Sequence, residues 1–165
     1  MPANCETYQD MDTRRTDAII KYVKDHAKSD KPFFVYFPSD AAQSVCANNE
    51  KFRNLPHVDK ANNLAVSLVE HDYNMGRLLE TLKETGIADN TLVVWYSDNG
   101  PMHGFYPNTG YSHFRGGKGD VTEGGVRVPA MAWWPGMIEP GQEPIDLLHV
   151  SDIYTTLARI GGVKD

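Results

Sequence analysis

Hydrophobic residues recur at helical spacing in three parts of the chain and form short continuous runs in three others. The spacing predicts helices over residues 13–27, 61–85 and 151–160, and the runs predict strands over residues 33–37, 91–96 and 126–134. A strand that is apolar on both faces belongs inside a sheet that helices cover on both sides. We therefore predict an α/β fold with a central, largely parallel sheet flanked by helices.

Residues typical of helix ends and loops support these boundaries. Gly86 follows the helix over residues 61–85 at the position where a C-terminal cap glycine belongs. Residues 39–60 are polar and are predicted to form a loop. Met75 and Met131 are expected to fill the core.

The segment between the last two predicted strands, residues 97–125, carries most of the candidate chemistry. It is rich in glycine, polar and aromatic residues and has no apolar periodicity, and a loop of this length is usually functional. Asp98 and Asn99 directly follow a strand and offer hard oxygen donors suited to Ca²⁺ or Mg²⁺. Taken alone, however, Ser-Asp-Asn-Gly is more often a simple turn.

Two further groups lie in this loop. Lys118, within Arg-Gly-Gly-Lys-Gly, can bring an ammonium group close to an oxyanion, although an isolated turn of this kind is more often solvated. The spacing of its glycines does not match a nucleotide-binding Walker A loop. His103 and His113 are expected to be solvated or bonded locally, and Glu123 and Arg127 are expected to pair.

Length, charge and hydropathy exclude several classes of partner. The 165 residues suit one domain, and the net charge of −6 with no basic stripe makes nucleic acid an unsuitable partner. No apolar stretch is long enough to span a membrane, and the N-terminus has no signal-peptide pattern. Neither the compartment nor the redox state of Cys5 and Cys46 follows from the sequence.

Several motifs taken together resemble one protein family. They are Ser97-Asp98-Asn99-Gly100, Arg115-Gly116-Gly117-Lys118-Gly119, Glu123-Gly124-Gly125-Val126-Arg127-Val128-Pro129 and Trp134-Pro135-Gly136, and shorter matches lie at Lys31-Pro32-Phe33-Phe34-Val35-Tyr36, Val69-Glu70-His71-Asp72 and Ser151-Asp152-Ile153-Tyr154. This string closely resembles the formylglycine-dependent, arylsulfatase-like sulfatases of the alkaline-phosphatase-like superfamily. The resemblance extends over most of the chain.

The resemblance implies roles for individual residues. Asp98 and Asn99 would supply two ligands of a calcium ion, and Lys118 would contact the sulfate of a small sulfate ester or a sulfated glycan. A divalent cation and an ammonium group neutralise charge on a sulfuryl group during transfer. Two side-chain ligands fall short of the six to eight oxygens that calcium prefers, so calcium binding by this chain alone is expected to be weak or absent.

The chain also departs from the family pattern. Neither Cys5 nor Cys46 lies in the Cys-x-Pro-x-Arg motif that yields the formylglycine nucleophile. The family's N-terminal pair of aspartates has no counterpart. Gln43 stands at the position where the family places a substrate-contacting histidine, and glutamine cannot act as an acid near neutral pH.

We therefore interpret residues 1–165 as a single partial sulfatase-like domain, the middle-to-late part of a catalytic domain, which is inactive by itself. The alternatives are a non-catalytic binding or interaction module derived from a sulfatase, and a fragment of a related phosphodiester or phosphonate hydrolase. In a partial domain the apolar strands would lack neighbouring strands and would expose their edges and faces. We therefore predict a homo-oligomer, most simply a two-fold dimer. Otherwise residues 1–12 or 39–60 would have to cover the exposed edges.

Overall fold

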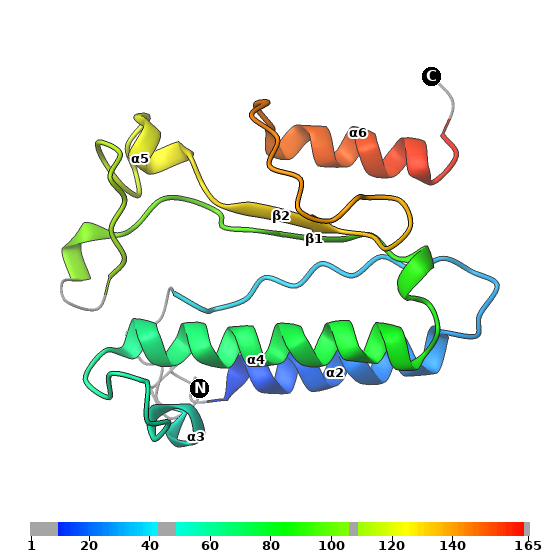
Figure 1. Ribbon diagram of the computed structural model, residues 1–165, viewed down its shortest axis with the longest axis horizontal. Coiled ribbons are helices and arrows are strands. Elements are labelled where there is room, and N and C mark those ends of the chain that lie inside the picture. The colour runs from blue at the N-terminus through cyan, green and yellow to red at the C-terminus, as the bar shows by residue number, and fades with distance from the viewer. Residues whose placement is uncertain (1–9, 43–48, 106–108, 164–165) are drawn as a thin grey trace, which may run out of the picture.

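The computed structural model describes residues 10–42, 49–105 and 109–163, and they form three layers (Figure 1). Helices α2 (Met11–His26) and α4 (Asn63–Glu84) lie side by side in one layer, with the short helix α3 (Glu50–Arg53) at one end. Strands β1 (Val93–Tyr96) and β2 (Ala130–Trp133) form the middle layer. Helix α6 (Val150–Ile160) lies on the other side of the strands. The α/β fold class predicted from the sequence is confirmed.

The three long helices lie where hydrophobic spacing predicts them. Helix α4 begins after Asn62, whose side-chain oxygen accepts a hydrogen bond from the Ala65 amide at 3.2 Å. It ends where Gly86 adopts a left-handed conformation, with φ of 74°. The amides of Gly86 and Ile87 then donate to the carbonyls of Lys83 and Leu82, at 3.0 and 3.1 Å. This is the Schellman arrangement, and it confirms Gly86 as the cap glycine.

The sheet differs from the prediction of a largely parallel arrangement. In the described residues it consists of β1 and β2, which pair antiparallel with Val93 opposite Trp133 and Tyr96 opposite Ala130. The predicted strand over residues 126–134 is shorter than expected because its first residue ends the helical turn α5 (Glu123–Val126). The connection from β1 to β2 returns to the end of β1 at which it began, where Gly100 bonds to Gly125, so the two strands run in opposite directions and no crossover joins them.

The predicted strand over residues 33–37 is not a strand in this structure. The segment is extended and runs lengthwise between the helix layer and the strands (Figure 1), but none of its described backbone groups bonds to β1 or β2. Phe34 and Tyr36 are both 71% exposed. A strand requires a neighbour to complete its ladder of hydrogen bonds, and the described residues provide none for this segment.

The apolar core is small and lies between α3 and the first half of α4. Phe52, Val58 and Val66 are buried, and three half-buried side chains pack around them: Leu55, Ala65 and Val69. Helix α3 lies within residues 39–60, which were predicted to form a loop, so that prediction is wrong for Glu50–Arg53. Met131 was predicted to be core and is instead 62% exposed on β2.

Most buried positions of α2 and α4 are polar, where an apolar seam would be expected, and the apolar ones are Val23, Val66 and Leu82. Thr16, Glu70 and Asn74 are buried there. Thr13 Oγ1 donates to Glu70 Oε1 at 2.6 Å, and Asn74 Nδ2 donates to Thr13 Oγ1 at 3.2 Å.

None of the helices in the described part of the chain has the length and apolar character that a membrane span requires.

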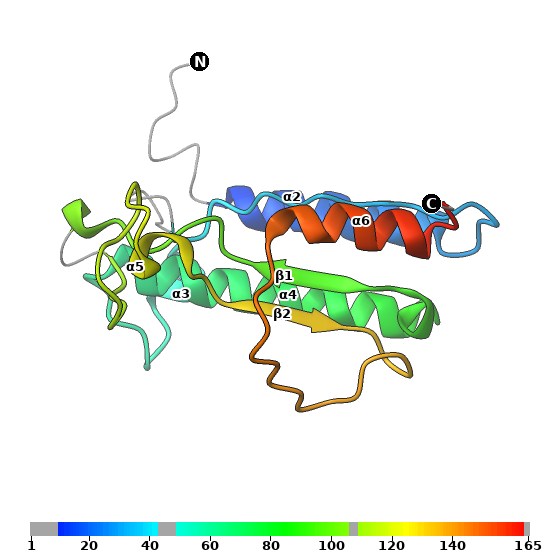
Figure 2. The ribbon, with the colours of Figure 1, turned by 90° about the horizontal axis from the view of Figure 1, so that it is seen from above.

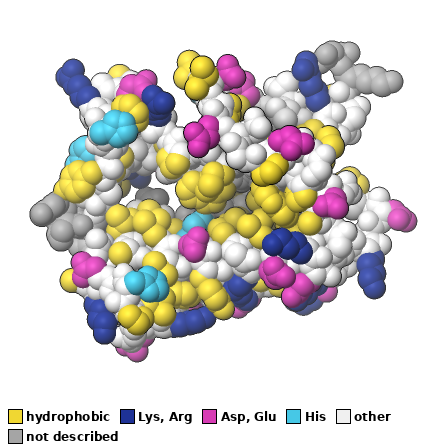
Figure 3. All heavy atoms as spheres, in the orientation of Figure 1, with side chains coloured by type: hydrophobic (Ala, Val, Ile, Leu, Met, Phe, Trp, Pro, Cys, Tyr) yellow, Lys and Arg dark blue, Asp and Glu magenta, His cyan; other side chains and the backbone are white. Residues whose placement is uncertain are grey.

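Helix α6 is uncovered on most of its surface. It buries none of its residues, and Gly162 follows its C-terminal end with φ of 86°. Seen from above in Figure 2, the segment joining β2 to α6 extends well away from the strands. In Figure 3, hydrophobic side chains gather across the middle of the face shown, between the helix layer and the strands. The structure therefore exposes apolar surface in more than one place.

Candidate functional site

The turn after β1 and the glycine-rich segment 115–125 are joined by backbone hydrogen bonds. Gly100 donates to the Gly125 carbonyl at 3.0 Å, and Lys118 donates to the Pro101 carbonyl at 2.9 Å. These bonds bring Lys118 next to the turn that carries Asp98 and Asn99, at the end of the strands where α5 lies (Figure 1). The structure thus joins the two segments that carry Asp98, Asn99 and Lys118.

Glycine is required where the two segments meet because their backbones touch. A Cβ atom on Gly100 would lie 2.8 Å from the carbonyl carbon of Gly124 and closer still to its oxygen. A Cβ on Gly125 would lie 2.6 Å from the Gly117 carbonyl oxygen. Real Cβ atoms do not approach so closely, and close backbone approach is a characteristic use of glycine. Gly100, Gly124 and Gly125 therefore let the site close.

Local hydrogen bonds fix the shape of each segment. Asn99 Nδ2 donates to the Gly100 carbonyl at 2.8 Å, which leaves its amide oxygen as an acceptor. Asp120 Oδ2 accepts from the Gly117 amide at 2.9 Å and holds the turn before it. Arg127 pairs with Glu123 at 3.3 Å, so the predicted pair is confirmed.

The chemistry of the donors fits a hard cation in part. Asp98 is exposed and offers a carboxylate, and the neighbouring Asn99 offers an amide oxygen. Among the residues that the structure describes, no three or more His, Cys, Asp or Glu side chains form a group able to hold a metal ion. Lys118 is exposed and lies in the segment that is bonded to the turn carrying this pair. Gln43, Cys5 and Cys46 lie outside the described residues, so the role suggested for Gln43 stays a prediction.

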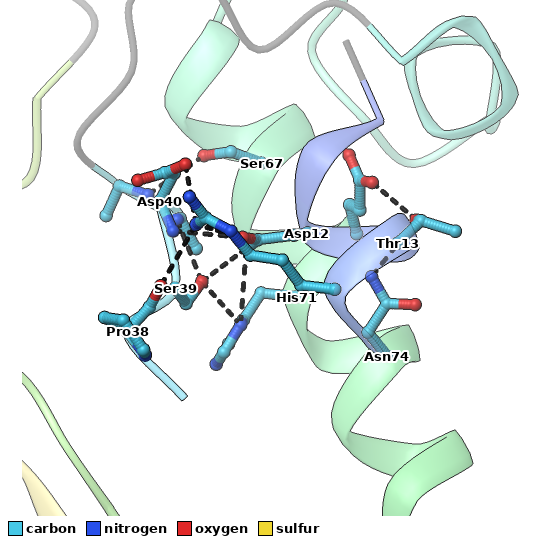
Figure 4. A network of polar contacts seen from close by, with 12 residues as sticks. Asp12, Thr13, Pro38, Ser39, Asp40, Ser67, His71 and Asn74 are labelled. Carbon is cyan, nitrogen blue, oxygen red and sulfur yellow. Dashed lines mark hydrogen bonds and ion pairs between the residues drawn. The ribbon is translucent and has the colours of Figure 1, made fainter. Parts of the chain in front are cut away.

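A second polar cluster joins four segments and was not predicted from the sequence (Figure 4). Ser39 Oγ donates a short hydrogen bond to Asp12 Oδ2. The Asp40 amide donates to Asp12 Oδ1 at 3.0 Å. His71 Nδ1 lies 3.1 Å from Ser39 Oγ, and Trp95 Nε1 donates to His71 Nε2 at 2.8 Å. The cluster thus ties α2, the end of the extended segment, α4 and β1 together.

The cluster contains a serine, a histidine and a carboxylate but is not built as a nucleophilic triad. Because Trp95 donates to Nε2, a neutral His71 carries its proton on Nδ1 and has no nitrogen left to accept one from Ser39. The Ser39 hydroxyl is itself committed to Asp12. Arg15 also reaches the cluster, at 2.8 Å from Asp40 Oδ2 and 3.1 Å from the Pro38 carbonyl. We infer that the cluster holds the chain at Ser39 and Asp40, just before the segment that leads to Gln43.

The pKa values of two buried carboxyls, Asp12 within this cluster and Glu70 beside it, shift in opposite directions. Burial alone would raise the pKa of Asp12, but the hydrogen bonds from His71, Ser39 and the Asp40 amide outweigh it and lower that pKa. Burial raises the pKa of Glu70, the charge of Asp12 adds to the rise, and the hydrogen bond from Thr13 opposes it. Asp12 is therefore stabilised in its ionised form, and Glu70 is not.

Replacing Asp12 by asparagine should lower the free energy of unfolding at pH 7 by about 1–3 kcal/mol, because an amide nitrogen cannot accept the Ser39 hydrogen bond. A carboxyl with a lowered pKa in the folded state stabilises the protein above its unfolded pKa and loses that effect as pH falls through the folded pKa. The difference between the two proteins should therefore shrink below about pH 4. Urea unfolding from pH 3 to pH 7 measures it.

Asp25→Asn is the matched control, since Asp25 lies on the same helix and only pairs with Lys21 at the surface. It should change stability by no more than about 0.5 kcal/mol. Equal losses in the two variants, or a loss for Asp12→Asn that grows toward acid pH, would contradict the role given to Asp12.

Comparison with known proteins places this chain in one family. The Sulfatase family model matches residues 1–163, so the chain belongs to the sulfatase family. A sulfatase of Formosa agariphila is 38% identical over 164 residues, a match that covers 90% of this chain and 29% of that protein.

Two solved structures share the fold. The PsFucS1 sulfatase from Pseudoalteromonas sp. has a TM-score of 0.84 and 36% identity, over 98% of this chain and 32% of that one. Ps i-CgsB, solved with k-i-k-neocarrahexaose, has a TM-score of 0.84 and 27% identity, over 93% and 34%. The fold is thus that of a sulfatase domain of the alkaline-phosphatase-like type, and the chain spans about a third of these relatives.

Proposed function

We propose that residues 1–165 form a single partial sulfatase-like domain that keeps part of a sulfate and metal site and does not hydrolyse sulfate esters by itself. The observation that carries this proposal is the joining of two segments: the Lys118 amide bonds to Pro101, and the Gly100 amide bonds to Gly125. These bonds join the segment that carries Lys118 to the turn that carries Asp98 and Asn99, which supports a shared site for an ammonium group, a carboxylate and an amide. Such a set suits the binding of an anionic ester with a divalent cation.

Each side chain has a distinct part in this proposal. Lys118 binds an oxygen of the sulfate through its ammonium group. Asp98 and Asn99 hold calcium through their side-chain oxygens, and the bound ion would neutralise charge on the sulfate. Gln43 donates a hydrogen bond to the substrate. The Asp12–Ser39–His71 cluster holds the chain from which residue 43 follows.

The ligand we propose is a sulfate ester, either a small molecule or a sulfated glycan. Support comes from the family and from the relative that was solved with k-i-k-neocarrahexaose. The net charge of −6 argues against nucleic acid as the partner. We further propose that the chain associates with itself as a two-fold dimer, because its exposed apolar side chains require cover.

A non-catalytic binding module is the second candidate, and the sequence favours it through one feature: neither cysteine stands in a Cys-x-Pro-x-Arg motif. Such a module would bind the same anion without turnover. A fragment of a related phosphodiester or phosphonate hydrolase would instead prefer a phosphorus ester.

The test measures both hydrolysis and binding. Purified protein should release no more product from methylumbelliferyl sulfate than its Lys118→Ala variant does, because no nucleophile motif is present. It should nevertheless bind inorganic sulfate, followed by the amide NMR signals of Gly117 and Lys118. Lys118→Ala should weaken that binding about tenfold, the loss of one charge-assisted hydrogen bond.

Lys31→Ala, at an exposed lysine before the extended segment, is the control and should leave sulfate affinity unchanged. Turnover that Lys118→Ala abolishes would show a working sulfatase and would contradict the proposed inactivity. A preference for a phosphate diester over sulfate would instead favour the phosphorus-ester alternative.

A further inference from the structure

A directed chain of hydrogen bonds runs from β1 through α4 to Ser39 and then to α2. Trp95 Nε1 donates to His71 Nε2 at 2.8 Å, and His71 Nδ1 lies 3.1 Å from Ser39 Oγ. Ser39 Oγ in turn donates to Asp12 Oδ2 (Figure 4). Since an indole N–H is a donor only, this chain requires the His71 tautomer with its proton on Nδ1, which then donates to Ser39. A neutral His71 therefore joins β1 to the cluster.

The centre of this chain is shielded from water by aromatic rings. His71 is 8% exposed, and Trp95 is half-buried. The ring centroid of His71 lies 6.2 Å from that of Trp95 and 6.4 Å from that of Phe37. An imidazolium carries a proton on both nitrogens, so its Nε2–H would face the indole N–H of Trp95. Two donors that face each other across 2.8 Å cannot bond, and a proton at Nε2 therefore breaks the contact between His71 and Trp95.

The Asp12 carboxylate on α2 would stabilise a positively charged His71. Asp12 Oδ2 lies 3.9 Å from His71 Nδ1. Burial opposes ionisation of Asp12, but its hydrogen bonds within the cluster outweigh burial and lower its pKa. Asp12 is therefore ionised throughout the range in which histidine changes charge. A second proton on His71 thus removes the bond to Trp95 and adds an ion pair with Asp12.

The other titratable groups around His71 come from three elements: Arg15 on α2, Asp40 after the extended segment, and Glu70 and Asp72 on α4. Arg15 and Asp40 pair with each other at 2.8 Å. Burial raises the pKa of Glu70, which favours its neutral form. Asp72 is exposed, so water screens its charge. β1 faces His71 with an uncharged indole. Asp12 is therefore the charged partner that a protonated His71 would take.

We propose that protonation of His71 is a switch that releases β1 at Trp95 and draws the imidazolium toward Asp12. The bonds of the structure correspond to the neutral, joined form. Asp98 follows Trp95 by three residues, so release of the strand acts directly on the turn that carries the candidate metal ligands. The switch is a conformational device, and it holds whether or not this turn binds calcium.

The test follows the indole N–H of Trp95 by NMR in the natural protein that contains this chain, with nitrogen-15 in its tryptophan and glycine residues. The protein is titrated between about pH 5 and pH 8, the range in which histidine changes charge. The Trp95 indole signal, assigned with the Trp95→Phe variant, should move toward the position of a free indole as the pH falls. The Gly86 amide, which closes α4 through its bond to Lys83, should not move over the same range.

Variants separate the switch from a merely structural contact. In His71→Gln the glutamine can accept from Trp95 and donate to Ser39 but takes up no proton, so the Trp95 signal should become independent of pH. Asp12→Asn should lower the pH at the midpoint of the Trp95 titration by about one unit, because it removes the carboxylate that stabilises the imidazolium. His57→Gln is the matched control, since His57 is exposed in the loop between α3 and α4, and it should leave the titration unchanged.

Three results would overturn the switch. A Trp95 signal that stays constant over the whole titration would show that β1 is not released. A titration that persists in His71→Gln would show that another group is responsible. Movement of the Gly86 signal with the same midpoint would show that α4 itself opens, rather than its contact with β1. None of these results bears on sulfate binding by Lys118, so the switch and the proposed function succeed or fail separately.

Discussion

Replacing Gly100 by alanine should disrupt the candidate site more severely than any other single methyl group added to it. The new Cβ would lie 2.8 Å from the Gly124 carbonyl carbon and nearer to its oxygen, and both belong to backbone that cannot rotate away. The turn after β1 would have to separate from the segment 115–125, with loss of the bond from Gly100 to Gly125. We expect a loss of about 3 kcal/mol in the free energy of unfolding, at the upper end for overpacking.

The same variant should lose sulfate binding, because Lys118 is positioned through the contact that the new methyl group breaks. Urea unfolding measures the first effect, and NMR titration with inorganic sulfate measures the second. Gly104→Ala is the matched control: apart from its chain neighbours, no atom of the described residues lies within 4 Å of its would-be Cβ, and its φ is not positive. It should change stability by no more than about 0.5 kcal/mol. A Gly100→Ala protein that keeps both its stability and its sulfate affinity would show that the two segments do not depend on each other.

The helices could be predicted from the sequence because their signals are local. Spacing of apolar residues locates α4, and Gly86 ends it through a conformation that only glycine adopts readily. The strands were harder to predict, since an apolar run indicates an extended segment but does not identify the neighbour that would pair with it or cover it. Residues 33–37 illustrate this: they are extended, yet the described structure gives them no partner. Helix α3 was missed because four residues are too few to show a period.

The candidate site could be predicted only in part. Asp98, Asn99 and Lys118 were identified from a family resemblance, and the structure supplies the backbone bonds that bring their segments together. The cluster of Asp12, Ser39 and His71 gave no signal, because its members are 27 and 32 residues apart in sequence and each is ordinary where it stands. The stacking of Tyr111 on His103 likewise depends on how the loop folds back on itself. Contacts of this kind require the tertiary structure.

We expect the purified chain to form a homo-oligomer, most simply a two-fold dimer. Ile145 and Leu147, in the segment before α6, are 98% and 101% exposed, and α6 itself buries no residue. The extended segment over residues 33–37 adds exposed aromatic rings and backbone groups that pair with no strand of the described part of the chain. Apolar surface and open strand edges of this kind favour association with a second copy. Closed two-fold symmetry is the commonest way for identical chains to cover the same patch.

Light scattering at tens of micromolar should therefore give about twice the mass of one chain. If the segment before α6 takes part, Leu147→Glu should shift the protein toward the monomer, because a charge would have to be buried in the contact. Val121→Glu is the control, since Val121 is also exposed but lies in the glycine-rich segment away from α6. A monodisperse monomer that binds no hydrophobic dye would overturn the prediction and would mean that the chain covers its own apolar surface. A dimer that Leu147→Glu leaves intact would instead place the contact at the open edge of the extended segment, where Tyr36→Glu is the variant to test next.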